Sequence, residues 1–303
     1  MTMPRAYLFP FFAILFWSGN VVVSKMAASE ISPTAITFYR LILALSIMSL
    51  FVLVPVFKNL KMIHKHWPKL ALGGLLSVAL FQSLSYQAAS TTTATNMAIV
   101  TALIPLLTII LSALILKDRV TVGMVFGGAL SLFGLIYLVS QGQMSHLLQQ
   151  DIHRGDFLML VAASGYALYS VLLKYWKMNI PAWQSTYVQA IFALIYMLPL
   201  FLLVPRDQAR LDSNTIPLIV YAGIFSSVLL SYLWIEGVRY LGPNRNNIFM
   251  NLLPLFTALA AIVFLNEKLH VYHLFGGAIT LSGIMLAQTL NKPLFTEKSR
   301  VTQ

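Results

Sequence analysis

Arg40 is the residue of this 303-residue chain with the clearest chemical meaning. By helical rise it lies roughly 10 Å inside an apolar stretch at residues 33–54, and it is the only strong cation that we do not place in a loop. A charge inside a membrane is costly and usually faces a cavity or a partner helix. A guanidinium at that depth suits the carboxylate or phosphate of a substrate. The alternative is structural, with Arg40 snorkelling to the headgroups or bonding to helix carbonyls.

Aromatic and amide side chains inside apolar stretches form a wider candidate set. Several of them are three or four residues apart, which places them on one face of a helix. As a group they predict the lining of a substrate cavity. Each one alone is equally consistent with hydrogen bonding between helices or with an aromatic belt at the membrane surface. With Arg40, the candidate substrate-binding residues are Trp17, Asn20, Tyr39, Gln82, Tyr86, Tyr166, Tyr169, Trp234, Asn247 and Asn251.

Other charged residues have two interpretations each. Glu236 is the only acid that we place within a span, near its end. It is a candidate for a coupling proton, and an ion pair with Arg239 or Arg245 is the alternative. Lys25 and Lys174 lie near the ends of two apolar segments. They would attract an anionic group at opposite gates, or anchor helix ends in the membrane interface.

The chain offers little for metal binding or catalysis. It has no cysteine, so it has neither a disulfide nor a thiolate metal site. His270 and His273 have a spacing that suits a metal, but a histidine pair without a third ligand is weak evidence. There is no HExxH motif, no pair of intramembrane aspartates, and no serine flanked by glycines with a histidine in a span. We therefore expect no enzyme, no metal and no cofactor.

These candidates need a lipid environment. The chain is 58% hydrophobic and 10% charged, with a mean hydropathy of +0.79, whereas a soluble domain has about 25% charged residues. The net charge of +11 comes from basic residues in the loops between apolar segments. That placement is typical of a membrane protein and argues against nucleic-acid binding.

Ten stretches have about the length of a transmembrane helix. They run at residues 6–27, 33–54, 69–90, 94–116, 120–140, 154–175, 182–204, 215–237, 245–265 and 270–290. With the N-terminus inside, the inner segments hold 14 Lys and Arg and the outer segments hold five. The positive-inside rule therefore places both termini in the cytoplasm. The first stretch is read as a span because no small-residue cleavage site stands out.

The positioning elements come from one unit used twice. Residues 96–138 align with residues 245–287 at a constant offset of 149, and 13 of the 43 pairs are identical. Each copy has five spans, so the second must enter the membrane upside down relative to the first, as in carriers that work by alternating access. Pro105 and Pro254 occupy equivalent mid-span positions. Each is a candidate kink that opens a gate, or a static kink that shapes the cavity.

The fold class follows from these observations. We predict an all-α membrane protein with ten transmembrane helices in two inverted five-helix repeats. The expected organisation is a first repeat at 1–149, a second repeat at 150–290 and a cytoplasmic tail at 291–303. Glycines recur in the fifth and tenth spans at 127, 128, 134, 276, 277 and 283. They predict close helix packing, within one chain or at a dimer contact, so the protein is a monomer or a homodimer.

The chain resembles the drug/metabolite transporter superfamily, and within it the ten-helix transporters of the EamA type. The segments that carry the resemblance are Phe16-Trp17-Ser18-Gly19-Asn20, Ser32-Pro33, Phe38-Tyr39-Arg40, and the repeated helix pair with its prolines, charged connectors and glycines. The resemblance covers about residues 6–290. It implies a bacterial inner-membrane carrier with a central cavity, and it does not identify the cargo.

One departure from related proteins matters. Small four-helix relatives exchange protons for lipophilic cations through a carboxylate in the first helix. Here the polar face of the first span has Trp17, Asn20 and Ser24 and no acid. That exchange mechanism is disfavoured.

The expected function is secondary transport of a small metabolite by alternating access, with export of amino acids or related carboxylates as the leading interpretation. A carrier of a vitamin or nucleotide-type aromatic metabolite is the runner-up, because a flat ring would stack on Trp17, Tyr166 or Trp234. A membrane sensor without transport is a third possibility, although it would need a sizeable soluble domain. The expected partners are the metabolite and the lipid bilayer of the inner membrane.

Overall fold

The computed structural model describes residues 6–117, 121–143, 154–241, 246, 249–290 and 292, and within them the helices form two groups of five spans. The first group comprises α2 (Leu8–Ala27), α3 (Pro33–Lys58), the run α5–η1–α6 (Trp67–Gly74, Leu75–Leu80, Phe81–Ala88), the pair α7 and α8 (Ala94–Ala102, Ile104–Ile115) and α9 (Val122–Val139). The second comprises α11 (Arg154–Trp176), α12 (Ala182–Leu202), the run α13–η3–α14 (Thr215–Val220, Tyr221–Leu229, Leu230–Leu241), the pair η4 and α16 (Phe249–Leu252, Leu253–Leu265) and α17 (Val271–Thr289). The short helices α4 (Leu60–Lys65) and η2 (Arg206–Ala209) lie in connections.

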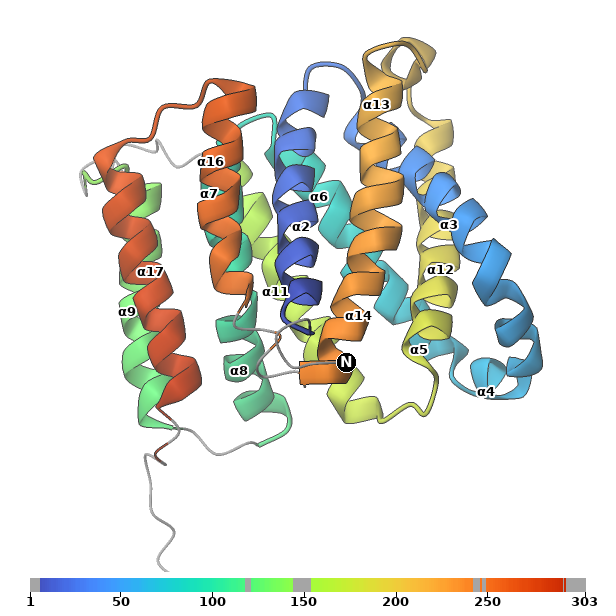
Figure 1. Cartoon of the computed structure of the whole chain (residues 1–303), viewed down its shortest axis with the longest axis horizontal. Coiled ribbons are helices and arrows are strands. Elements are labelled where there is room, and N and C mark those ends of the chain that lie inside the picture. Colours follow the sequence, from blue (N-terminus) through green and yellow to red (C-terminus); the bar gives the residue numbers. More distant parts are fainter. Residues whose placement is uncertain are drawn as a thin grey trace, which may run out of the picture.

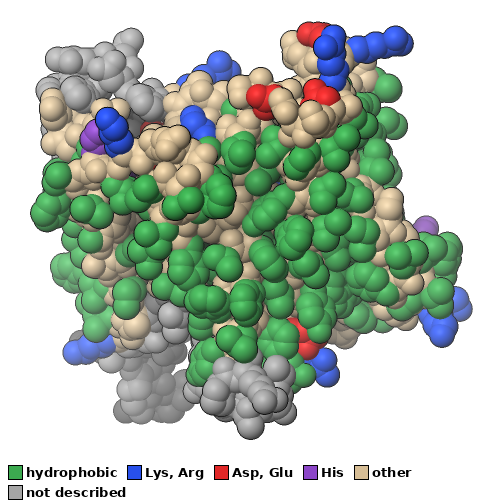
Figure 2. All heavy atoms as spheres, turned by 45° about the horizontal axis from the view of Figure 1, so that its top comes forward, with side chains coloured by type: hydrophobic (Ala, Val, Ile, Leu, Met, Phe, Trp, Pro, Cys, Tyr) green, Lys and Arg blue, Asp and Glu red, His purple; other side chains and the backbone are tan. Residues whose placement is uncertain are grey.

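All ten predicted spans are helical. Seven runs are long and apolar enough to cross a membrane, and three shorter apolar helices complete the set at Val122–Leu138, Phe249–Leu265 and Val271–Ala287. Figure 2 shows hydrophobic side chains covering the side of the bundle, while Lys, Arg, Asp and Glu gather towards its two ends. The lateral surface therefore matches the hydrocarbon core of a bilayer. The fold class predicted from the sequence is confirmed.

The helix ends follow local sequence signals. Pro33 occupies the first turn of α3, where its missing N–H costs nothing. The Thr93 side chain accepts a hydrogen bond from the Asn96 backbone N–H and caps α7. Pro105 is the second residue of α8, which follows a break at Leu103, and Pro254 is the second residue of α16, which follows η4. Both prolines therefore interrupt their spans, as their missing N–H groups predict.

The two groups have opposite directions in the bundle. Figure 1 shows α2 rising from the marked N-terminus towards the end where α16 leads into α17, and α7–α8 descending beside it. We call the end where α2 terminates the Lys25 end. The helices α9 and α17 lie side by side at one edge (Figure 1). The halves are inverted copies, as the odd number of spans requires.

Four of the repeated glycines lie at the contact between α9 and α17, namely Gly127, Gly134, Gly276 and Gly283. A Cβ on Gly127 would lie 2.4 Å from the Gly283 carbonyl oxygen, and one on Gly134 would lie 2.5 Å from the Thr280 backbone nitrogen. Any larger residue at these positions would push the helices apart. For these glycines the contact within one chain is observed, and a dimer contact stays a prediction.

Each half also carries a π-helical segment in its third span. The first is η1 at Leu75–Leu80, and the offset of 149 places it on residues 224–229, inside η3. π-turns are rare and occur frequently at functional sites. Their recurrence at equivalent positions directs attention to the side chains that they present.

Candidate functional site

Arg40 lies at the centre of a polar cluster inside the bundle. Its side chain is only 2% exposed. The Nη1 atom donates to Gln82 Oε1 at 2.8 Å, to Tyr86 Oη at 3.1 Å and to Asn20 Oδ1 at 3.3 Å. The Nη2 and Nε atoms donate to Ser227 Oγ at 2.9 and 3.2 Å, and Nη2 also reaches Ser226 Oγ at 3.3 Å. We call these six side chains the arginine cluster.

Four segments bring the arginine cluster together. Asn20 comes from α2 and Arg40 from α3, while Gln82 and Tyr86 lie one turn apart on α6. The two serines come from η3 in the second half of the chain. Ser227 Oγ also donates to the Ala222 carbonyl five residues earlier at 2.8 Å, so the wide π-turn fixes the hydroxyl that accepts from Arg40. The cluster therefore joins the two halves.

The partners of Arg40 are all neutral. Among the described residues, no carboxylate bonds to it. Neutral oxygens satisfy the N–H donors but leave the positive charge uncompensated, and burial of such a charge is expensive. Two unit charges about 4 Å apart attract by about 4 kcal/mol at an effective dielectric constant near 20. An anion placed beside the guanidinium would supply the missing counter-charge.

A second cluster is aromatic and lies beside the first. The Trp17 ring lies 6.3 Å from Tyr166, 6.4 Å from Phe81 and 6.4 Å from Trp234. Tyr166 also contacts Tyr169, with ring centroids 5.8 Å apart. Trp17 and Asn20 are one turn apart on α2, so that helix links the aromatic cluster to Arg40. The sequence grouped all of these except Phe81, which was not expected.

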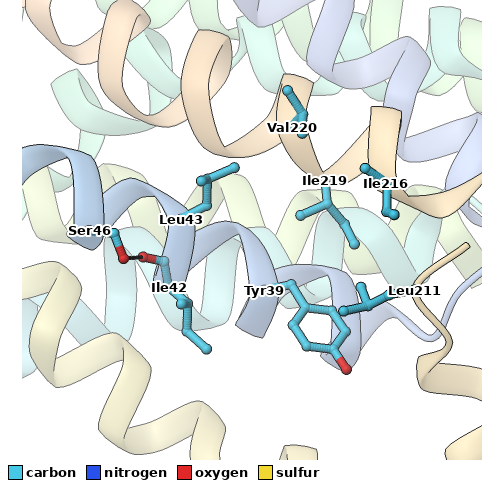
Figure 3. A pocket seen from close by; sticks show the side chains of 8 residues that line it. All are labelled: Tyr39, Ile42, Leu43, Ser46, Leu211, Ile216, Ile219 and Val220. Carbon is cyan, nitrogen blue, oxygen red and sulfur yellow. Dashed lines mark hydrogen bonds between the residues drawn. The ribbon is translucent and has the colours of Figure 1, made fainter.

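Tyr39 does not join the arginine cluster. Adjacent residues on a helix point about 100° apart, and the Tyr39 hydroxyl instead donates to the Ala209 carbonyl at 3.0 Å. Its ring lines a mostly apolar hollow of about 270 Å³ between α3 and α13, shown in Figure 3. Leu43 of α3 and Ile219 and Val220 of α13 also line this hollow (Figure 3). Tyr39 as a substrate-binding residue stays a prediction without support from its neighbours.

Lys25 has a structural partner. Its ammonium donates to the carbonyls of Ala89 and Thr92, at 2.8 and 2.7 Å, where α6 ends. A cation at the carboxyl end of a helix satisfies terminal carbonyls and complements the dipole. Lys25 also borders a hollow of about 310 Å³ with Ser29 and Ser90. Its symmetry mate Lys174 lies in the last turn of α11.

Two carboxylates of the second half contact the first half at the Lys25 end. Glu267 accepts the Ala94 N–H at 2.7 Å and the Thr95 hydroxyl at 3.0 Å. Asp156 accepts from the Thr92 hydroxyl and from Asn96 Nδ2. These bonds join the two halves around the start of α7. Asp156 is buried in the first turn of α11, which corrects the expectation that Glu236 is the only acid within a span.

The remaining predicted residues have different surroundings. Glu236 pairs with Arg239 at 3.4 Å, which is the ion-pair interpretation. His273 Nδ1 accepts the His270 backbone N–H at 3.1 Å, so this nitrogen caps α17. The described residues contain no group of three or more potential metal ligands. Asn251 has a buried amide oxygen that finds no hydrogen-bond partner among the described residues, and Asn247 lies outside them.

Ser226 and Ser227 were missed by the sequence analysis. A pair of serines in an apolar span is weak evidence alone, since serine hydroxyls commonly bond to their own helix. The offset of 149 places Ser226 on Ser77, in the other π-segment. A serine at the equivalent position of each half was the sequence signal that could have identified Ser226.

Comparison with known proteins agrees with this architecture. The model of the EamA-like transporter family matches residues 4–140 and again residues 153–289. The chain is 24% identical to the "Uncharacterized transporter YyaM" of Bacillus subtilis (strain 168) over 275 residues, covering 90% of each protein. It is 27% identical over 286 residues to an "Uncharacterized transporter" of Archaeoglobus fulgidus, covering 93% of this chain and 96% of the relative.

A solved crystal structure has the same fold. It covers 94% of this chain and 97% of its own, with a TM-score of 0.64 and 17% sequence identity. The two family matches fall on the two helical halves described above. The chain belongs to the EamA-like transporter family.

Proposed function

We propose that this transporter carries small carboxylate metabolites, amino acids first among them, outwards across the bacterial inner membrane by alternating access. The observation that carries the proposal is Arg40, a buried cation whose described partners are all neutral. A carboxylate would supply the missing counter-charge and would accept the guanidinium fork in a bidentate manner. Neutral partners such as Gln82 and Ser227 would then be displaced and would remain available to a polar neighbour of the carboxylate.

The aromatic cluster supports a mostly apolar body for the substrate. Trp17 lies one turn from Asn20 on α2, and Phe81 lies next to Gln82 at the start of α6. A molecule whose carboxylate reaches Arg40 therefore meets aromatic rings on two of the same helices. Aromatic rings bind apolar groups and stack on flat ones. The same cluster gives weight to a vitamin or nucleotide-type substrate with an anionic group, which is the second candidate.

The conformation supports alternating access between inverted halves. Arg40 is buried, and the two hollows described above are lined by other residues. Asp156 and Glu267 join the halves at the Lys25 end, and we expect this end to face outwards from the distribution of Lys and Arg. Transport requires these contacts to open, and the helix breaks at Pro105 and Pro254 are the proposed bending points.

Counterflow in proteoliposomes tests the proposal. Vesicles with purified protein are loaded with a mixed pool of amino acids, small organic acids, vitamins and nucleosides, and exchange is followed by mass spectrometry. Arg40→Gln is compared with Arg239→Gln, which removes a charge from an exposed side chain on α14. We expect selective exchange of carboxylate compounds that is lost only in the Arg40 variant.

Other outcomes have distinct meanings. Exchange of nucleosides or cations that survives Arg40→Gln would refute a carboxylate site at Arg40. The conclusion that the protein is a transporter would stand. Exchange of an aromatic vitamin that needs Arg40 would select the second candidate.

A further inference from the structure

The internal repeat gives Arg40 a counterpart in the second half that carries no charge. The offset of 149 places Arg40 of α3 on Gln189 of α12. Arg40 bonds to Ser226 in the π-segment of the second half. Gln189 is bonded by Ser77 in the π-segment of the first half, with Ser77 Oγ 3.4 Å from Gln189 Oε1. The same offset relates Ser77 to Ser226, so the two contacts are symmetry mates.

The symmetry extends through the aromatic cluster. Asn20, which contacts Arg40, corresponds to Tyr169, and Trp17 corresponds to Tyr166. Tyr169 and Gln189 meet at Gly73, where an added Cβ would lie 3.2 Å from the Tyr169 ring and 3.1 Å from the Gln189 side-chain carbon. The rings of Trp17 and Tyr166 contact each other at 6.3 Å.

A continuous line of contacts therefore connects the two positions. It starts at Arg40, passes through Asn20 and one helix turn to Trp17, and continues through Tyr166 to Tyr169, whose side chain is hydrogen-bonded to Gln189. The pseudo-two-fold axis falls between Trp17 and Tyr166, at the middle of the line. Its two ends are polar and its middle is aromatic.

Gln189 is buried like Arg40 but carries no charge. Its side chain is 3% exposed, and its amide donates to Ser185 Oγ at 2.8 Å. An amide both donates and accepts hydrogen bonds, whereas a guanidinium only donates. The two ends of the line thus differ by one unit of charge.

We propose that Gln189 forms the second polar end of the substrate site and selects substrates with a carboxylate at one end and an uncharged hydrogen-bonding group at the other. This inference rests on the proposed function, because it requires a carboxylate at Arg40. A second carboxylate at Gln189 would be buried against a neutral amide without a cation, which is costly. A methyl group there would leave the amide without a substrate partner. An amide or hydroxyl fits.

Matched acids test this site. The probes are straight-chain monocarboxylates, dicarboxylates and dicarboxylic acid monoamides, compared at equal length over a series of lengths. Binding to the protein in nanodiscs is measured by the rise in melting temperature with ligand concentration. We expect the monoamides to bind about tenfold more tightly than the other two classes, which corresponds to one net hydrogen bond.

Variants at Gln189 then test whether this residue causes the preference for monoamides. Gln189→Arg should transfer the preference to dicarboxylates, because it places a second cation at the symmetric position. Gln189→Leu should abolish the tighter binding of the monoamides. If the leucine variant fails to fold, Gln189→Asn, which keeps an amide at this position, is measured in its place. Gln184→Leu is the control, since Gln184 is another buried glutamine of α12 and bonds to Asn59 instead.

The outcomes distinguish a failure of this inference from a failure of the proposed function. Acids that bind through Arg40 with the same preference in every Gln189 variant would overturn this inference and leave the proposed function. The absence of any acid binding that depends on Arg40 would overturn both.

Discussion

Replacement of Arg40 by glutamine should weaken substrate binding by about two orders of magnitude. The attraction between the guanidinium and a bound carboxylate about 4 Å away is about 4 kcal/mol at an effective dielectric constant near 20. The glutamine amide keeps one neutral hydrogen bond, which returns about 1 kcal/mol. The net loss of about 3 kcal/mol corresponds to roughly a hundredfold to two-hundredfold increase in the dissociation constant.

A comparison with lysine separates charge from geometry. Arg40→Lys keeps the positive charge and loses the planar fork that bonds to Gln82, Tyr86 and Ser227 together. Its binding should therefore fall between wild type and Arg40→Gln. The half-saturation concentration for counterflow of the identified substrate measures this order. Equal values for the lysine and glutamine variants would show that charge does not govern binding.

The stability of the ligand-free protein provides a second readout. Arg40 is buried among neutral groups, so its removal also removes the cost of keeping a charge away from water. We expect Arg40→Gln to melt at the wild-type temperature or above it without ligand, and to lose the stabilisation that substrate gives to wild type. A structural arginine would behave in the opposite way, and a large drop in the melting temperature of ligand-free Arg40→Gln would refute this reasoning.

Three further substitutions probe other parts of the molecule. Gly127→Ala should destabilise the fold because its Cβ would lie 2.4 Å from a backbone oxygen, whereas Gly128→Ala should be neutral or stabilising, since its nearest neighbour is 3.9 Å away; melting temperatures in detergent check the pair. Glu267→Ala removes a charged cap at the Lys25 end, worth about 1.5 kcal/mol or more. Because the chain has no native cysteine, a Ser227→Cys probe can report access to the arginine cluster, and Glu267→Ala should speed its thiol labelling about tenfold. Unchanged labelling would show that this contact does not hold the end closed. Hydrogen bonding from the Thr215 backbone lowers the pKa of Asp212 below its ordinary value, so its support of α13 should be present at neutral pH and fall away as pH drops through the lowered pKa; amide exchange at residues 214–216 should show this loss in wild type and not in Asp212→Ala.

The sequence was sufficient to predict the spans and the inversion, and four of the six residues of the arginine cluster were among the predicted substrate-binding residues. Asn20, Gln82 and Tyr86 were predicted with Arg40 because polar side chains in apolar spans need internal partners. Tyr39 was in the same candidate set, but the helical rotation between neighbouring residues points it away from Arg40. Sequence spacing within one helix constrains which face a residue occupies, and it does not state which helix that face meets.

The contacts between halves were beyond the sequence for the same reason. Ser226 reaches Arg40 only because η3 packs against α3, and nothing local to the serine indicates that contact. The π-segments have no strong sequence signal, since they arise from a shift in backbone hydrogen bonding. The proline breaks were predictable because the cause lies in the residue itself.

The two halves agree where they pack and differ where they would meet a substrate. Equivalent glycines hold α9 against α17, and an exchange of conformations between halves needs such interchangeable contacts. The arginine cluster instead draws on α2, α3, α6 and η3, where the repeat places glutamine on Arg40 and tyrosine on Asn20. The fold therefore supplies two equivalent positions for polar groups, and the side chains make one of them cationic and the other neutral. Under the proposed function, specificity would depend on residue identity at a few symmetric pairs, and the charge at position 189 should be open to change without disturbing the packing that allows movement.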